Sequence, residues 1–143
     1  MSIVDIYKVL DLHISRADKA AEEISRIQLS TNAFDNFETV KTFDTFIYRF
    51  SKIQDYMGEK LFPATLDILG DYKYSMSFKD ILNKLERLEL IQSVQQWMSF
   101  REIRNTLTNE YPDNEDEIIE GITLAVNAYA EIKNIYAAIK ARL

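Results

Sequence analysis

The side chains best suited to chemistry gather in residues 101–112, where an apolar stretch ends in polar groups. Arg104 carries a permanently charged guanidinium, whose fork of N–H donors fits carboxylates and phosphates. Asn105 and Asn109 add amides, which donate and accept hydrogen bonds, and Tyr111 adds a phenol. Because the stability of a fold does not require such a cluster, these residues predict a site that binds an anion.

The segment that must position these groups reads as one helix ending near Asn109. At about 100° per residue, its core side carries four apolar residues: Trp97, Phe100, Ile103 and Leu107. A second row is apolar where it starts and polar where it ends: Val94, Met98, Arg101, Asn105 and Thr108. This row suits contact with a partner beside a polar site, but two exposed apolar residues are also ordinary on a protein surface. Spacing alone leaves both interpretations open.

Arg104 falls at the border of the core side, where a half-buried guanidinium needs an oxygen acceptor or an anionic ligand. Two interpretations follow. The arginine head can bind an anion in a site, or it can pair with an acid of the second predicted helix, such as Asp55 or Glu59. Composition favours the internal pair, so the argument for a site depends on the residues around Arg104.

Three groups outside this segment are further candidates. His13 is the only histidine and falls within an apolar stripe, where a hydrogen-bonded structural role is more common than a catalytic one. Arg49 and Lys52, together with Arg101, are expected to provide the local positive patch that RNA phosphates require. For Lys52 the favoured interpretation is a solvated helix face with intrahelical pairs.

The composition restricts the class of protein. The 143 residues suit one domain, residues 1–143, with a real hydrophobic core. The chain has no cysteine and one histidine, which excludes disulfides and a multi-histidine metal centre and fits a reducing cytoplasm. The N-terminus lacks the basic region of a signal peptide, and no apolar run approaches the roughly 20 residues of a membrane span. The net charge of −6 opposes non-specific binding to nucleic acid.

The rest of the chain predicts helices and no strands, so the expected fold is an all-α, antiparallel, up-and-down bundle of four to five helices. Apolar or small residues spaced by three and four form a seam on the first helix: Ile3, Ile6, Leu10, Ala17, Ala20, Ile24 and Ile27. The last helix has another: Ile118, Ile122, Ala125, Tyr129, Ile132, Tyr136 and Ile139. Gly58 and Pro63 interrupt the second helix, so a kink or an end is expected near Lys60, and Gly70 suits a stop.

Helix starts are indicated by a short polar residue followed three positions later by an acid or amide. Three such pairs occur: Asp35 with Glu38, Ser77 with Asp80, and Ser93 with Gln96. Pro112 is expected to stop the helix that carries Arg104, and Asp113 or Asn114 to begin the last helix.

Residues 104–112 resemble the signature of HEPN-domain proteins, in particular the HepT-like toxins. That signature is Arg, often Asn, three further residues, His, any residue and Tyr. Arg104, Asn105 and Tyr111 match it, and Asn109 stands at the histidine position. The resemblance implies a HEPN-like helical bundle and a metal-independent endoribonuclease, in which the motifs of a homodimer line one cleft.

The resemblance also implies roles for residues. Arg104, with Asn105 beside it, stabilises charge on the phosphoryl oxygens, and the position of Asn109 supplies the acid and base. In the family, a nucleotidyltransferase antitoxin silences the toxin by attaching AMP to the motif tyrosine, here Tyr111. The implied partners are this antitoxin, a second copy of the chain and RNA, with no membrane and no cofactor. The expected contacts with RNA or the partner are Arg49, Met98 and Arg101.

Asn109 leaves the catalytic half of the motif incomplete, because an amide cannot transfer a proton near neutral pH. General acid–base help contributes about 10²–10⁴-fold, so cleavage should be weakened or lost. The sequence leaves three explanations open: a natural degenerate member, an inactivating substitution, or another base such as Glu110 or the partner's Tyr111. It also leaves three functions open: a HepT-like toxin with reduced cleavage, a non-enzymatic HEPN-like substrate- or nucleotide-binding module that pairs with a nucleotidyltransferase, and a structural bundle.

Overall fold

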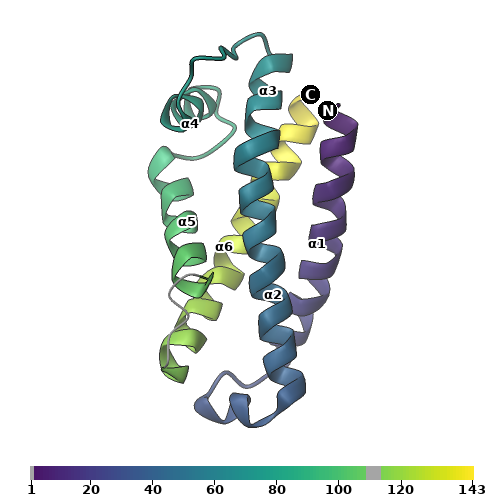
Figure 1. Ribbon diagram of the computed structural model, residues 1–143, viewed down its shortest axis with the longest axis vertical. Coiled ribbons are helices and arrows are strands. Elements are labelled where there is room, and N and C mark those ends of the chain that lie inside the picture. The colour runs from purple at the N-terminus through teal and green to yellow at the C-terminus, as the bar shows by residue number, and fades with distance from the viewer. Residues whose placement is uncertain (1, 109–113) are drawn as a thin grey trace.

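The computed structural model describes residues 2–108 and 114–143. Over these residues the protein is an all-α helical bundle with five helices and no strand, when α2, η2 and α3 are counted as one continuous helix (Figure 1). The α-helices are α1 (Ile3–Ser25), α2 (Phe37–Tyr56), α3 (Phe62–Ile68), α4 (Phe78–Arg87), α5 (Val94–Thr108) and α6 (Glu115–Arg142). The other helices are a 3₁₀ helix, η1 (Thr31–Asp35), and a π-helix, η2 (Met57–Leu61). None of these described helices combines the length and apolar character needed to cross a membrane.

The helix α2 is the central element of the bundle. It packs against α1, α5 and α6, and α5 packs in turn against α6. Figure 1 shows α1 and α5 on opposite sides of α2, with the long helices running alternately up and down and both chain ends at the same end. The short α4 is seen nearly end-on beside the start of α5 (Figure 1). Polar side chains on α1 and on α5 that face α2 therefore find their partners on that helix.

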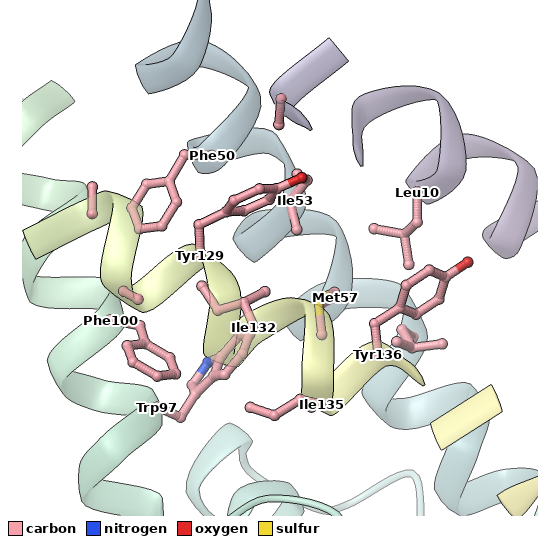
Figure 2. Close-up of a cluster of buried hydrophobic side chains, with 14 of the residues drawn as sticks. Leu10, Phe50, Ile53, Met57, Trp97, Phe100, Tyr129, Ile132, Ile135 and Tyr136 are labelled. Atoms are coloured by element: carbon pink, nitrogen blue, oxygen red, sulfur yellow. The ribbon is translucent and has the colours of Figure 1, made fainter. Parts of the chain in front are cut away.

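The core confirms the predicted seams. Five residues of the α1 seam are buried: Ile6, Leu10, Ala17, Ala20 and Ile24. All seven residues predicted for the last helix are buried in α6. Aromatic side chains of α2, α5 and α6 meet at the centre, where Phe50, Trp97, Phe100 and Tyr129 lie together (Figure 2). The ring centroids of Trp97 and Phe100 lie 6.1 Å apart, edge to face, and such pairs contribute about 0.5–1.5 kcal/mol beyond the area that they bury.

The interruption expected near Lys60 is present, but it neither ends nor breaks the helix. Residues Met57–Leu61 form the π-helix η2, and α3 continues from Phe62 with Pro63 in its first turn. A proline has no N–H to donate and its ring crowds the preceding turn, and both effects are smallest at a helix start. The wider π-turn gives the proline ring room, so the helix continues through α3 to Ile68. Gly70, with a φ of 81°, follows the end of the helix, as predicted.

The predicted helix starts are confirmed in part. Ser77 and Asp80 form the capping box of α4 with both reciprocal hydrogen bonds. Ser93 accepts the backbone N–H of Gln96 at 3.0 Å, but the Gln96 side chain donates to Gln92 instead. The prediction for Asp35 is wrong by one residue, because η1 includes Asp35. Asn36 caps α2 and Asn114 caps α6, whereas Pro112 and Asp113 lie outside the described residues.

Two tyrosines fasten α6 to α1. The Tyr129 hydroxyl donates to Asp18 Oδ1 at 2.6 Å, and the Tyr136 hydroxyl donates to Asp11 Oδ1 at 2.8 Å. Lys133 lies 2.9 Å from the same oxygen of Asp18, so that acid joins two residues of α6. Burial, followed by the hydrogen bond to Asp18, raises the pKa of Tyr129 well above its ordinary value.

Replacing Tyr129 by Phe tests this contact. We expect Tyr129→Phe to lower the free energy of unfolding by about 1–2 kcal/mol, since a hydrogen bond to a carboxylate is lost. In the wild type, the unfolded chain ionises Tyr129 above about pH 10 while the folded chain keeps it neutral, so stability falls as the pH rises through that value. The variant should lose less stability between pH 8 and pH 11. Urea unfolding at several pH values measures both effects.

The matched control is Tyr74→Phe, because the side chain of Tyr74 is 96% exposed. This substitution should leave both the stability and its pH dependence unchanged. Identical unfolding curves for Tyr129→Phe and Tyr74→Phe would show that the hydroxyl of Tyr129 does not hold α6 to α1.

Candidate functional site

Arg104 lies near the end of α5 and faces α2. Its Nη2 lies 2.7 Å from Asp55 Oδ2, and the two side chains are 23% and 39% exposed. Asp55 is one of the two acids that the sequence offered as an internal partner, so the internal pair is the arrangement observed. On its other side, α5 packs closely on α6, since a Cβ at Gly121 would lie 2.8 Å from Leu107 Cδ2. The end of α5 is thus fixed from both sides.

A second nitrogen of Arg104, Nη1, contacts side chains of α5 itself. Nη1 donates to Asn105 Oδ1 at 3.2 Å and to Thr108 Oγ1 at 3.3 Å. Three of the five N–H donors are used in this way, and the buried Nε has no partner in the described part of the chain. The guanidinium is held in one orientation by Asp55, Asn105 and Thr108. Its charge is offset by Asp55, so an anion that binds here must compete with that carboxylate.

Gln54, next to Asp55, is a contact that the sequence reasoning missed. Its side chain is buried, and its Nε2 donates to the Phe100 carbonyl of α5 at 3.0 Å. A glutamine among the apolar residues Phe50, Ile53 and Met57 is the signal that could have found it, because a buried amide requires hydrogen-bond partners. We call the contacts of Gln54 with Phe100 and of Asp55 with Arg104 the α2–α5 joint.

Four of the five residues of the second row predicted on this helix lie along one open groove, and Thr108 is not among them. Val94, Met98, Arg101 and Asn105 line a depression of about 930 Å³ between α4 and α5, to which Lys79 also contributes. Met98 is 45% exposed, and the Arg101 guanidinium lies 5.1 Å from the centre of the Phe78 ring. The groove is therefore apolar at the end of Val94 and Met98 and polar at the end of Arg101 and Asn105. Asn105 accepts a hydrogen bond from Arg104 at this polar end.

The other predicted basic residues lie elsewhere. Arg49 Nη1 lies 2.9 Å from His13 Nδ1, between α2 and α1, and the cations of Arg49 and Lys52 lie over the Tyr48 ring. These residues face α1, whereas Arg101 and Arg104 belong to α5 on the opposite side of α2 (Figure 1). The structure does not bring Arg49 and Lys52 into one patch with Arg101.

His13 is held as a neutral acceptor. An arginine can only donate, so Nδ1 of His13 accepts from Arg49, and the ring proton belongs on Nε2. Burial lowers the pKa of His13, and the charges of Arg49, Lys52 and Arg16 lower it further. Its place between α1 and α2 separates it from the α2–α5 joint.

Three of the residues named from the sequence, Asn109, Glu110 and Tyr111, lie outside the described residues. Within residues 2–108 and 114–143, no three or more histidine or acidic side chains are grouped so that they could hold a metal ion. The described part of the site therefore consists of Arg104, Asn105 and the residues that hold them.

A double-mutant cycle measures the ion pair of the joint. Asp55→Asn, Arg104→Gln and their combination should give a coupling of about 1 kcal/mol, because both side chains are partly exposed. The control cycle uses Arg26 and Glu22, a more exposed pair on one helix, for which we expect a smaller coupling. A coupling for Asp55 and Arg104 no larger than that of the control would mean that the pair does not fix α5. Urea unfolding provides the free energies.

Comparisons with known proteins add no relative. No family model matches the chain, and neither a curated protein nor a solved structure matches it significantly. The residues that bear on function are those of the α2–α5 joint and those that follow Thr108 in the sequence.

Proposed function

We propose that this chain is a HEPN-like bundle of the HepT-like kind, the toxin member of a cytoplasmic toxin–antitoxin pair, with RNA cleavage weakened or lost. The observation that supports this most is the order of Arg104, Asn105, Asn109 and Tyr111 in the sequence. A guanidinium held by Asp55, Asn105 and Thr108 stands directly before the segment that contains Asn109 and Tyr111 in the sequence. This is the order of positions in the motif, with Asn109 at the histidine position.

The chemistry explains both what is present and what is lacking. When a 2′-hydroxyl attacks a phosphodiester, negative charge grows on the phosphoryl oxygens, and a pre-oriented guanidinium such as that of Arg104 stabilises it. The attacking hydroxyl must also lose a proton, for which Asn109 is unsuited. His13 cannot replace it within one chain, because it faces Arg49 on the other side of α2. We therefore expect the chain to bind RNA through Arg104 but to cleave it little.

One protomer alone offers few positive groups to RNA, and a second copy of the chain would add more. The chain carries a net charge of −6, and Asp55 offsets Arg104, so one protomer attracts RNA weakly. Two copies that meet along the groove of Val94 and Met98 would bury the exposed Met98 and bring two sets of Arg101 and Arg104 to one cleft. The homodimer that the family resemblance implies is therefore part of the proposal.

The second candidate is a non-enzymatic substrate- or nucleotide-binding module that pairs with a nucleotidyltransferase. Asn109 favours it, because a binding module needs the anion-binding arginine but no proton transfer. In both candidates Tyr111 is the residue that the nucleotidyltransferase would modify with AMP.

Restoring the histidine tests the proposal. We expect Asn109→His to raise cleavage of single-stranded RNA by about 10²–10⁴-fold without a metal ion, and a second change, Arg104→Gln, to abolish the gain. Asn127→His is the matched control, because it places the same side chain at an exposed position of α6. Cleavage of a labelled RNA in the presence of a chelator is the measurement.

An Asn109→His variant that is inert on RNA and harmless to cells contradicts the toxin proposal. If this inert variant still co-purifies with a nucleotidyltransferase, the binding module is selected instead. A structural bundle predicts that Arg104→Gln lowers only the melting temperature and leaves binding of RNA and partner unchanged.

A further inference from the structure

A second cavity lies next to the α2–α5 joint, where α2, η2, α4 and α5 meet. Its volume is about 380 Å³, which is within the ~300–1,000 Å³ range of small-molecule pockets. Asp55 belongs both to the wall of the cavity and to the ion pair with Arg104. The chemically most informative residues of the wall are Gln54, Asp55, Glu59, Phe78, Trp97 and Arg101.

Two side chains of the wall carry buried polar atoms without a partner. Gln54 is 3% exposed and Trp97 is 1% exposed, yet Gln54 Oε1 and Trp97 Nε1 have no hydrogen bond within the described part of the chain. Because the Gln54 nitrogen already donates to the Phe100 carbonyl, the free atom of the amide is the acceptor oxygen. Both atoms are inaccessible to solvent as the side chains stand. An unmet buried donor or acceptor costs about 1–3 kcal/mol, so a small turn of either side chain toward an occupant of the cavity would be favoured.

The charged groups of the wall are of both signs. Glu59 and Asp55 provide carboxylates, which only accept hydrogen bonds, and Arg101 provides a guanidinium, which only donates them. Asp55 is already paired with Arg104, whereas Glu59 forms no ion pair with any described residue. Arg101 is supported by the Phe78 ring, at 5.1 Å from its centre. An occupant with acceptors on one edge and N–H donors on another fits these groups.

The backbone of the wall is unusual at this point. Gly58 and Glu59 belong to η2, and π-helical turns inside α-helices occur frequently at functional sites. A Cβ at Gly58 would lie 3.4 Å from the Phe78 ring, so the glycine lets that ring lie close to η2. The π-turn and the glycine together set how closely Phe78 of α4 approaches η2 at this wall of the cavity.

We propose that this cavity binds a nucleobase with the hydrogen-bonding edges of guanine. Guanine has two acceptors on one edge, which suit the Arg101 fork, and N–H donors on another edge, which suit the Glu59 carboxylate. The apolar and aromatic wall of Phe78, Trp97 and Ile81 covers its flat faces. As a subsite for RNA, the cavity rests on the proposed function, and it would seat a base beside the phosphate at Arg104.

An organic cation is the competing occupant, because carboxylates beside aromatic rings also attract cations. Arg101 argues against it, since its guanidinium already lies over the Phe78 ring and repels a second cation. Tetramethylammonium, which has no N–H donor, separates the two possibilities in the experiment.

The experiment follows the indole N–H resonance of Trp97 by NMR, which is unambiguous because the chain has one tryptophan. Guanosine, without a phosphate, is titrated into the full chain, and adenosine, uridine and tetramethylammonium are titrated in parallel. We expect a saturable shift with guanosine and at least about tenfold weaker binding of the others. Glu59→Gln should weaken guanosine binding about tenfold, whereas Glu120→Gln, an exposed change on α6 outside the wall, should not.

Three results would overturn the inference: no saturable shift, equal shifts with every nucleoside, or unchanged guanosine binding in Glu59→Gln. A shift with tetramethylammonium alone would identify a cation site instead. The outcome is distinct from that of the RNA test, because guanosine binding does not require Asn109→His to cleave, and cleavage by that variant does not require a guanine site.

Discussion

The α2–α5 joint is the contact on which the candidate site depends. Two consecutive residues of α2, Gln54 and Asp55, hold α5 at Phe100 and at Arg104, which are one helical turn apart. The buried amide of Gln54 orients α5 but adds little to the free energy of folding, because its hydrogen bond to the Phe100 carbonyl replaces one to water. The ion pair with Asp55 restricts the Arg104 side chain, which would otherwise adopt many rotamers. Together with the buried core residues of α5, the joint fixes the α5 wall that the groove beside α4 and the cavity beside η2 share.

The joint also limits the positive charge at the anion site that we propose. Asp55 lowers the net charge around Arg104, which limits non-specific attraction, and fixes the guanidinium for a ligand that meets further donors. Those donors belong to Asn105 and Arg101 on the same helix, and to the second copy in the proposed dimer. Asp55 also belongs to the cavity wall. A base bound in the cavity would therefore contact the same carboxylate with which a phosphate at Arg104 would compete.

Sequence reasoning was most successful where one local rule decides the outcome. The spacing of apolar residues located the buried seams of α1 and α6, and the pair of Ser77 and Asp80 located the start of α4. It also named Asp55 as an acid within reach of Arg104, although Glu59 remained an equal choice. That choice depends on the rotation of α2 against α5, which a one-dimensional pattern does not contain.

The errors of the sequence reasoning have the same origin. Gly58 and Pro63 indicated an interruption, but only three-dimensional packing decides that a π-turn absorbs it. Arg49 and Arg101 were expected in one patch, and α2 separates them because one contacts α1 and the other contacts Phe78 of α4. The cavity could not be foreseen at all, since its wall combines residues of the continuous helix of α2, η2 and α3 with residues of α4 and α5, which are distant from it in sequence.

The central claim is that Arg104, held by Asp55, receives an RNA phosphate, and the side-chain Nε–H resonance of Arg104 tests it most directly. This resonance can be assigned by its absence in Arg104→Lys and followed while a short single-stranded RNA is added. The account predicts a saturable shift of this resonance that weakens as salt is raised, because phosphate binding displaces counterions. RNA that shifts only the resonances of Arg49 and its neighbours on the α1 side, or none, would contradict the account.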